Sequence, residues 1–194
     1  NWIMSNSSTN QGGGGVSVFA GSSDYQILKN RIAGNLSIWN GGGICHYGLS
    51  DNGLVSGNKI LMNEVFFGAQ VGGDGGGIYL SALAGPVGGL TDGAGSVAIV
   101  GNLIQGNLAG SGAGGGIRAD AYNGTDTQAA PQGSWYHLQI LSNMIVNNVA
   151  AMYGSGVSLK EVARVSMLHN TVSRNDTTST ARAAFPVGSP QSVP

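Results

Sequence analysis

The chain repeats one asparagine-centred frame, and this repetition constrains its fold more than any other feature. In each copy an asparagine follows an aliphatic residue by three positions, a second aliphatic residue comes two positions later, and a second asparagine follows after three more. The copies lie at residues 27–35, 55–63, 99–107, 140–148 and 167–175, with a shortened copy at 1–6. Such regular internal spacing indicates a repeat architecture.

The copies are spaced as expected for successive turns of a solenoid. Their first asparagines are separated by 29, 28, 44, 41 and 27 residues. Each period also holds a glycine-rich signature, usually Gly-Gly-Gly-Ile, and ends in a third short apolar run. The glycine signatures lie at residues 12–16, 41–44, 75–78, 114–117 and, in weaker form, 154–157.

These short runs predict strands rather than helices. They contain four to six residues, include β-branched members and are bounded by glycine or asparagine, and no stretch carries a sustained helical period. Three short strands per period predict an all-β parallel β-helix of about five to six coils over residues 1–175. A leucine-rich repeat is the alternative, but its Leu-x-x-Leu-x-Leu motif is missing.

Stacked coils would place equivalent residues directly over one another, because hydrogen-bonded strands lie about 4.8 Å apart. The two asparagine columns suit corners, since asparagine tolerates the left-handed conformation and stacked amides can hydrogen-bond. The glycine triplets suit the next corner, where positive φ or close backbone approach excludes a Cβ atom. Three aliphatic columns would form the core: Ile3, Ile32, Ile60, Ile104, Ile145 and Val172; Ile27, Val55, Ile99, Ile140 and Met167; and Val16, Ile44, Ile78, Ile117 and Val157.

The Asn-x-Ile-x-x-Asn and Gly-Gly-Gly-Ile repeats resemble those of right-handed parallel β-helix proteins, the pectin-lyase-like superfamily. They look most like the repeats of secreted bacterial surface and autotransporter-type proteins. The resemblance covers residues 1–175 and implies a right-handed coil. It does not choose an activity, because the superfamily includes lyases, hydrolases, epimerases, phage tailspikes and non-catalytic adhesins. Asn170-Thr171 is followed by Val172, so the Asn-Thr-Asp motif of the hydrolases is not matched, and the Asp-Pro-His motif of the epimerases is missing.

Two periods carry insertions. The third and fourth are 16 and 13 residues longer than a 28-residue norm, which predicts loops at 82–95 and 121–134, with about six extra residues near 67–74. Because both main loops leave the same corner of adjacent coils, they must lie side by side. Insertions of this kind often build the binding face of a solenoid. Residues 176–194 are expected to form a terminating coil and a linker-like tail.

The strand after each glycine triplet predicts a candidate binding face. Alternation points its aliphatic residue inward and the next and third residues outward. Among the outward residues, Tyr47 and Tyr79 could stack on a sugar, and Arg118, Asp120 and Lys160 could hydrogen-bond to it. A solvated outer strand with ordinary charges is the alternative interpretation.

An enzyme is the weaker hypothesis. A polysaccharide lyase needs basic groups, which Arg118, Lys160 and Arg164 could supply. Catalytic residues cannot be assigned. No cofactor is expected, and the one candidate ion is Ca²⁺, whose ligands would be Asp74, Asp92, Asp120 and Asp126; these are scattered in the sequence, whereas Ca²⁺ sites cluster their oxygens.

The histidines are expected to be structural. His46 follows Ile44 by two positions, so it should point inward as a hydrogen-bonded core histidine. His137 and His169 flank the third apolar run and lie too far apart in the sequence to suggest a dyad.

The low charge of the chain limits its partners. Only 9% of residues are charged and the net charge is −1, so no basic field exists for nucleic acid, and no apolar run is long enough to span a membrane. Abundant glycine, serine, asparagine and threonine favour an extracellular or cell-surface location. The sequence therefore predicts an extracellular β-helical structural or adhesive module that contacts glycans on the insertion-bearing face. The alternatives are a polysaccharide lyase or glycoside hydrolase of the pectin-lyase-like type, and a subunit of a surface filament or sheath whose partners are neighbouring β-helical segments.

Overall fold

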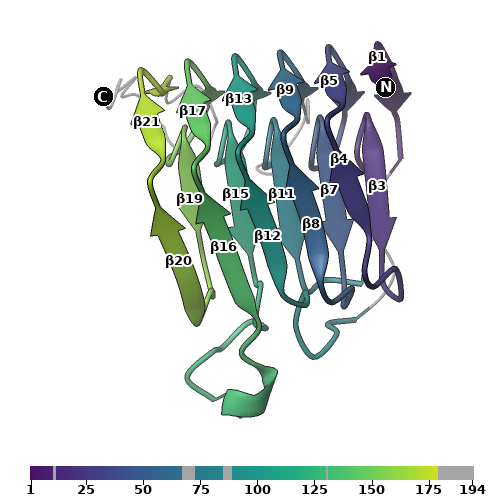
Figure 1. The fold of residues 1–194 in the computed structure, drawn as a ribbon, viewed down its shortest axis with the longest axis vertical. Helices are drawn as coiled ribbons and strands as arrows, with labels where there is room; N and C mark the ends of the chain where they lie inside the picture. The colour runs from purple at the N-terminus through teal and green to yellow at the C-terminus, as the bar shows by residue number, and fades with distance from the viewer. Residues whose placement is uncertain (11, 67–72, 85–88, 130, 179–194) are drawn as a thin grey trace, which may run out of the picture.

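The computed structural model describes residues 1–10, 12–66, 73–84, 89–129 and 131–178. These residues form a parallel β-helix in which four parallel sheets run side by side along the axis (Figure 1). The coil is right-handed, which is the hand that parallel crossover connections almost always take. Among the described residues, no helix has the length and apolar character needed to cross a membrane.

Each of the first five coils contributes one strand to each sheet, and the last described coil adds a strand to sheets A and B. Sheet A contains β1 (Trp2–Met4), β5 (Arg31–Ala33), β9 (Lys59–Leu61), β13 (Leu103–Gln105), β17 (Met144–Val146) and β21 (Thr171–Ser173). Sheet B contains β2 (Ser7–Ser8), β6 (Leu36–Ser37), β10 (Glu64–Val65), β14 (Leu108–Ala109), β18 (Val149–Ala150) and β22 (Asp176–Thr177). Sheet C contains β3 (Val16–Phe19), β7 (Ile44–Tyr47), β11 (Ile78–Ser81), β15 (Ile117–Asp120) and β19 (Val157–Leu159). Sheet D contains β4 (Gln26–Leu28), β8 (Gly53–Ser56), β12 (Val97–Val100), β16 (His137–Leu141) and β20 (Arg164–Leu168).

The coil has four strands, not the three that the sequence predicted. The additional strand is the two-residue segment after the second asparagine, such as Leu36–Ser37. Its inward position holds small or short side chains, among them Ser37, Val65 and Ala109. Two residues are too few to show an alternating pattern, so the segment could not be distinguished from a corner in the sequence.

The three predicted aliphatic columns are confirmed. In sheet A, Ile32 is in register with Ile3 and Ile60, and Ile104 is in register with Ile60 and Ile145. The columns of sheets C and D pair in the same way. The central members are fully buried and form one continuous core along the axis.

The two asparagine columns form hydrogen-bonded ladders. In one step, Asn58 Nδ2 donates to Asn102 Oδ1 at 3.0 Å and to the carbonyl of Ile27 at 2.7 Å. The Asn58 backbone N–H donates to the same Asn102 Oδ1 at 2.8 Å. In turn, Asn58 Oδ1 accepts from the side chain and backbone of Asn30. Each buried amide is therefore satisfied by the coils on both sides.

The left-handed residue at each corner is not the asparagine but the residue before it. This corrects one of the two reasons given above for asparagine at these positions. In the second column the preceding residues are Ser5, Gly34, Met62, Gly106, Asn147 and Arg174, all with φ between 51° and 67°. The asparagine side chain is instead selected by its ladder bonds.

The glycine triplets serve both predicted purposes. The first glycine has positive φ at Gly41 (66°), Gly75 (69°) and Gly114 (69°). The second and third approach neighbouring coils closely. A Cβ atom on Gly42 would lie 2.6 Å from the carbonyl oxygens of Glu64 and Gly76, which leaves no room for a side chain.

The two main insertions lie side by side, as predicted. They follow β11 and β15, which are neighbours in sheet C, and the second contains the 3₁₀ helix η1 (Gln132–Ser134). The Ala94 N–H donates to the carbonyl of Tyr122 at 2.8 Å, and the Tyr122 hydroxyl donates to the carbonyl of Gly95. The extra residues predicted near 67–74 fall mostly outside the described residues, as does the tail from 179; β22 extends the last coil to Thr177.

Candidate functional site

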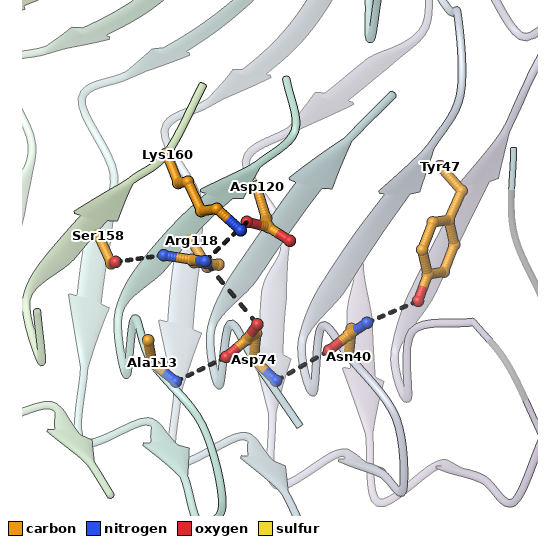
Figure 2. A network of polar contacts seen from close by, with 8 residues as sticks. All are labelled: Asn40, Tyr47, Asp74, Ala113, Arg118, Asp120, Ser158 and Lys160. Carbon is orange, nitrogen blue, oxygen red and sulfur yellow. Dashed lines mark hydrogen bonds and ion pairs between the residues drawn. The ribbon is translucent and has the colours of Figure 1, made fainter. Parts of the chain in front are cut away.

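The predicted site residues come together on the outer face of sheet C. Tyr79 of β11 is in register with Arg118 of β15, and Ser81 is in register with both Tyr47 and Asp120. Lys160 follows β19 and its backbone N–H donates to the carbonyl of Ala119. Figure 2 shows the charged members of this group close together across neighbouring coils.

Arg118 is the centre of the group. Its Nη1 donates to Ser158 Oγ at 2.6 Å, its Nη2 donates to Asp120 Oδ1 at 2.7 Å, and its Nε lies 3.7 Å from Asp74 Oδ2. Lys160 Nζ lies 3.5 Å from the same Asp120 oxygen (Figure 2). The two carboxylates and two cations balance, so the network is electrically neutral while Arg118 is buried.

Asp74 connects this network to the neighbouring coil. Its Oδ1 accepts a hydrogen bond from the Ala113 N–H at 2.6 Å, and its own N–H donates to Asn40 Oδ1 at 2.8 Å. Asn40 Nδ2 then donates to the Tyr47 hydroxyl at 2.8 Å (Figure 2). Burial raises the pKa of the Asp74 carboxyl, while the Ala113 N–H and Arg118 act in the opposite direction. The carboxyl is thus held in place by the network, and its side chain remains 21% exposed.

Tyr47 and Tyr79 cannot take the stacking role predicted for them in this structure. Their ring centroids lie 5.5 Å apart in a small cluster with Cys45, and Leu83 packs against it. Tyr79 is only 2% exposed, and burial raises its pKa well above the ordinary value. Strand alternation set their outward direction correctly, but other residues cover the rings.

The accessible part of the site consists of Lys160 and Tyr153, with the edge of Asp120. The Lys160 side chain is 60% exposed and Tyr153 is 51% exposed. The Arg118 Cζ lies 5.7 Å from the centroid of the Tyr153 ring, within the range of a cation–π contact. Of these exposed residues, the sequence prediction named Lys160 and did not name Tyr153.

Three residues of the network were not predicted to lie on this face, although Asp74 was named as a candidate Ca²⁺ ligand. All three share one position in the repeat. Asn40, Asp74 and Tyr153 each stand directly before the first glycine of a triplet, and Ala113 occupies the equivalent place. This column folds against the outer face of sheet C. At the next position, a Cβ atom added to Gly41 would lie 2.6 Å from Cys45 Cβ. The sequence shows this column, because each member directly precedes a glycine triplet. The column could therefore have been predicted to line the site.

His46 is the satisfied core histidine that the sequence predicted. It is fully buried; its Nε2 lies 2.9 Å from the Gly48 carbonyl and 2.8 Å from the Ala94 carbonyl. Its Nδ1 lies 2.9 Å from the Tyr25 hydroxyl. Since carbonyls only accept, Nε2 carries the proton and Nδ1 accepts from Tyr25. Burial lowers the pKa of this imidazole, which is held neutral.

A second polar pair lies on the outer face of sheet D. His137 Nε2 is 2.9 Å from Ser166 Oγ, beside a shallow groove of about 400 Å³ lined in part by Asn52 and Gln139. Within the described ranges, no carboxylate forms an ion pair with His137. A serine–histidine pair without an orienting third group is not sufficient to define a nucleophile.

The aspartates proposed for Ca²⁺ are not gathered into one site. Asp126 Oδ1 accepts hydrogen bonds from the Gln128 and Ala129 N–H groups of its own loop. Asp74 and Asp120 instead pair with Arg118. In the part of the chain that the structure describes, no three or more His, Cys, Asp or Glu side chains are grouped to hold a metal ion.

Comparison with known proteins finds no family model, no curated protein and no solved structure that matches this chain. The architecture therefore defines the class by itself, a parallel β-helix with internal asparagine ladders.

Proposed function

We propose that this chain is a rigid, extracellular structural module that adheres to glycans through its insertion-bearing face. The observation that carries the proposal is the network of ion pairs and hydrogen bonds around Arg118. Its carboxylates and cations pair with one another and with backbone groups. Such a network stiffens the face at the base of the loops, whereas an acid–base catalyst would need a group that reaches substrate.

The exposed rim of the network supports the adhesive part of the proposal. Lys160 offers three hydrogen-bond donors to solvent, and the half-exposed Tyr153 ring offers an aromatic surface beside it. The two loops after β11 and β15 lie side by side, and the second loop contacts Glu161, the neighbour of Lys160, through Thr127. A sugar that contacted Tyr153 and Lys160 would meet a rigid support.

The repeats also support membership of the right-handed, pectin-lyase-like β-helix superfamily. The specific support is the combination of Asn-x-Ile-x-x-Asn frames with glycine triplets, whose amide ladders and close-packed corners account for every repeated residue type. Within that superfamily, the proposal places the chain with the non-catalytic surface proteins.

The test is binding to a panel of immobilised polysaccharides, with Tyr153→Ala and Lys160→Ala as variants. Met144→Ala is the matched control because Met144 is also half-exposed but belongs to sheet A. We expect each site variant to weaken binding about three- to tenfold, as loss of one exposed contact would, and the control to bind normally.

Two outcomes would overturn the proposal. Release of unsaturated uronate products from any polysaccharide in the panel would establish a lyase. Lateral or end-to-end assembly without glycan binding would instead identify a subunit of a filament or sheath.

A further inference from the structure

Three of the eight lysine and arginine residues of the chain gather at sheet A, whereas the candidate site lies on sheet C. Lys29, Arg31 and Lys59 line one groove of about 280 Å³ on the outer side of β1, β5 and β9 (upper right in Figure 1). Trp2 and the buried corner residue Asn30 complete much of its wall. Among the described residues, no carboxylate lines the groove.

The groove places two positive charges at paired positions of neighbouring strands, which is unfavourable in a sheet. Arg31 and Lys59 are directly in register on neighbouring parallel strands, so their side chains emerge about 4.8 Å apart on one face. Like charges in register are destabilising. None of the three cations forms an ion pair within the described residues, whose salt bridges all involve Arg118 or Lys160. The fold therefore holds three uncompensated positive charges together.

Trp2 gives the groove an aromatic wall. It is in register with Arg31, and alternation points it outward because Ile3 faces the core. The Arg31 Cζ lies 6.0 Å from the centroid of the Trp2 ring, while the tryptophan remains 80% exposed. One large aromatic surface is thus open to a ligand beside the three cations.

From this juxtaposition we infer that the groove is a binding site for an acidic polysaccharide. The cations would bind its carboxylate or sulfate groups, with Arg31 offering a planar donor fork that matches an oxyanion. The Trp2 ring would stack on a sugar face between charged groups. A nucleic acid fits less well, because the net charge of the whole chain is −1 and the groove offers only three cationic side chains to a phosphate backbone.

This site is separate from the insertion-bearing face, so the two proposals can fail independently. The probes are polygalacturonate and dextran sulfate, which distinguish carboxylate from sulfate, with neutral dextran and a DNA oligonucleotide for comparison. The key variant is Lys29→Gln/Lys59→Gln. Its matched control is Arg164→Gln/Arg174→Gln, which removes the same two charges at exposed positions outside the groove.

We expect one or both acidic polysaccharides to bind at low salt, and the groove variant to bind about five- to tenfold more weakly, with the control changed less than about twofold. Trp2→Ala should weaken binding several-fold without changing its dependence on salt, since it removes a stacking surface and no charge. Equal weakening in both double variants would overturn the inference by showing a response to net charge alone. So would DNA binding as tight as that of the polysaccharides. Loss of binding in Lys160→Ala, with the groove variant unaffected, would overturn it in favour of the insertion-bearing face.

Discussion

At the scale of single residues, the corners of the coil show which positions carry conformational strain. The residue before each corner asparagine adopts a left-handed backbone, and glycine occupies only some of these places. Met62 is the clearest exception, with φ of 51° and a side chain that is 71% exposed. The equivalent residues one coil away on either side are Gly34 and Gly106.

We predict that Met62→Gly stabilises the protein. A non-glycine residue in this conformation costs about 1–2 kcal/mol, which glycine avoids. Glycine also gains conformational freedom in the unfolded chain, and this offsets about 0.4–1 kcal/mol of the gain in stability. A net gain of about 0.5–1 kcal/mol is expected in chemical denaturation. Gly106→Met is the reverse experiment and should lose a similar amount. Destabilisation by Met62→Gly would show instead that the exposed methionine makes contacts that matter.

His46 makes the stability of the protein dependent on pH. The folded pKa of His46 lies below 6.5. Once the pH falls below 6.5, the unfolded state therefore binds a proton more readily than the folded state does. Stability from this group is therefore complete above 6.5 and decreases as the pH falls towards the folded pKa, by up to about 1.4 kcal/mol per pH unit.

The measurement is the free energy of unfolding at about pH 7.5 and about pH 5.5, on either side of the histidine transition. His46→Gln should lose less stability than the wild type between these conditions, although its baseline is lower because Tyr25 loses its partner. His169→Gln, at an exposed corner, should keep the wild-type difference. An unchanged difference in His46→Gln would show that another group titrates.

At the scale of elements, the asparagine ladders connect every coil to the next. Asn107 Oδ1 accepts from the Asn63 side chain and backbone, and Asn107 Nδ2 donates to Asn148 Oδ1 and the carbonyl of Ile60. Each interior asparagine thus satisfies buried groups in two neighbouring coils. Within the described part of the chain, an end member such as Asn6 has one ladder neighbour, Asn35.

We predict that Asn107→Ala destabilises the protein by about 3 kcal/mol or more, since several buried polar groups lose a partner at about 1–3 kcal/mol each. Asn6→Ala is the control and should cost less than about 1 kcal/mol, because its site is only partly buried. Denaturant unfolding monitored by circular dichroism measures both. Equal costs at the two positions would contradict the ladder as a cooperative element.

The network on sheet C predicts a different response. Arg118→Met leaves the largely buried Asp74 without its main counter-ion, which should cost about 2–3 kcal/mol at neutral pH. Burial already raises the Asp74 pKa above 3.8, and removal of Arg118 raises it further. The cost exists only while Asp74 is ionised, so it appears as the pH rises through the folded pKa and disappears on acidification.

Unfolding at neutral pH and at about pH 4 therefore should show a smaller difference between Arg118→Met and wild type in acid. The double variant Arg118→Met/Asp74→Asn should recover most of the loss, because no buried charge remains unpaired. Lys160→Met is the control; its exposed side chain should contribute less than about 1 kcal/mol. Failure of the double variant to recover stability would indicate that packing around Arg118 dominates.

At the scale of the whole molecule, burial decreases from the central coils to the last one. The core residues Ile60, Ile104 and Ile145 are fully buried, whereas Val172 in the last coil is 45% exposed. In a solenoid each coil is stabilised mainly by its neighbours. We predict that amide hydrogen exchange in this 194-residue chain is slowest in β9, β13 and β17 and fastest in β21 and β22. Uniform protection along the sheets would show that the ends are stabilised as strongly as the middle.

The fold was largely predictable because each repeated residue type meets a physical requirement of stacked coils. Hydrogen-bonded coils impose register, so residues such as Ile32 and Ile60 had to stack, and the period of two along each strand had to point Arg118 and Asp120 outward. The two-residue strands of sheet B were missed because they are shorter than one alternation. The paired insertions were found because equal corners of adjacent coils are neighbours.

By itself, the sequence determined the direction of each side chain, and only the tertiary structure decided which of them solvent reaches. Direction follows from local periodicity and register. Exposure depends on segments outside the strand itself: Asn40 and Asp74, from the corners before the glycine triplets, and Leu83, from an insertion, pack beside Tyr47, Tyr79 and Arg118. Arg31 and Lys59 lie 28 residues apart, and only the stacking of coils makes them one basic groove. These contacts between coils are where the candidate binding sites are assembled.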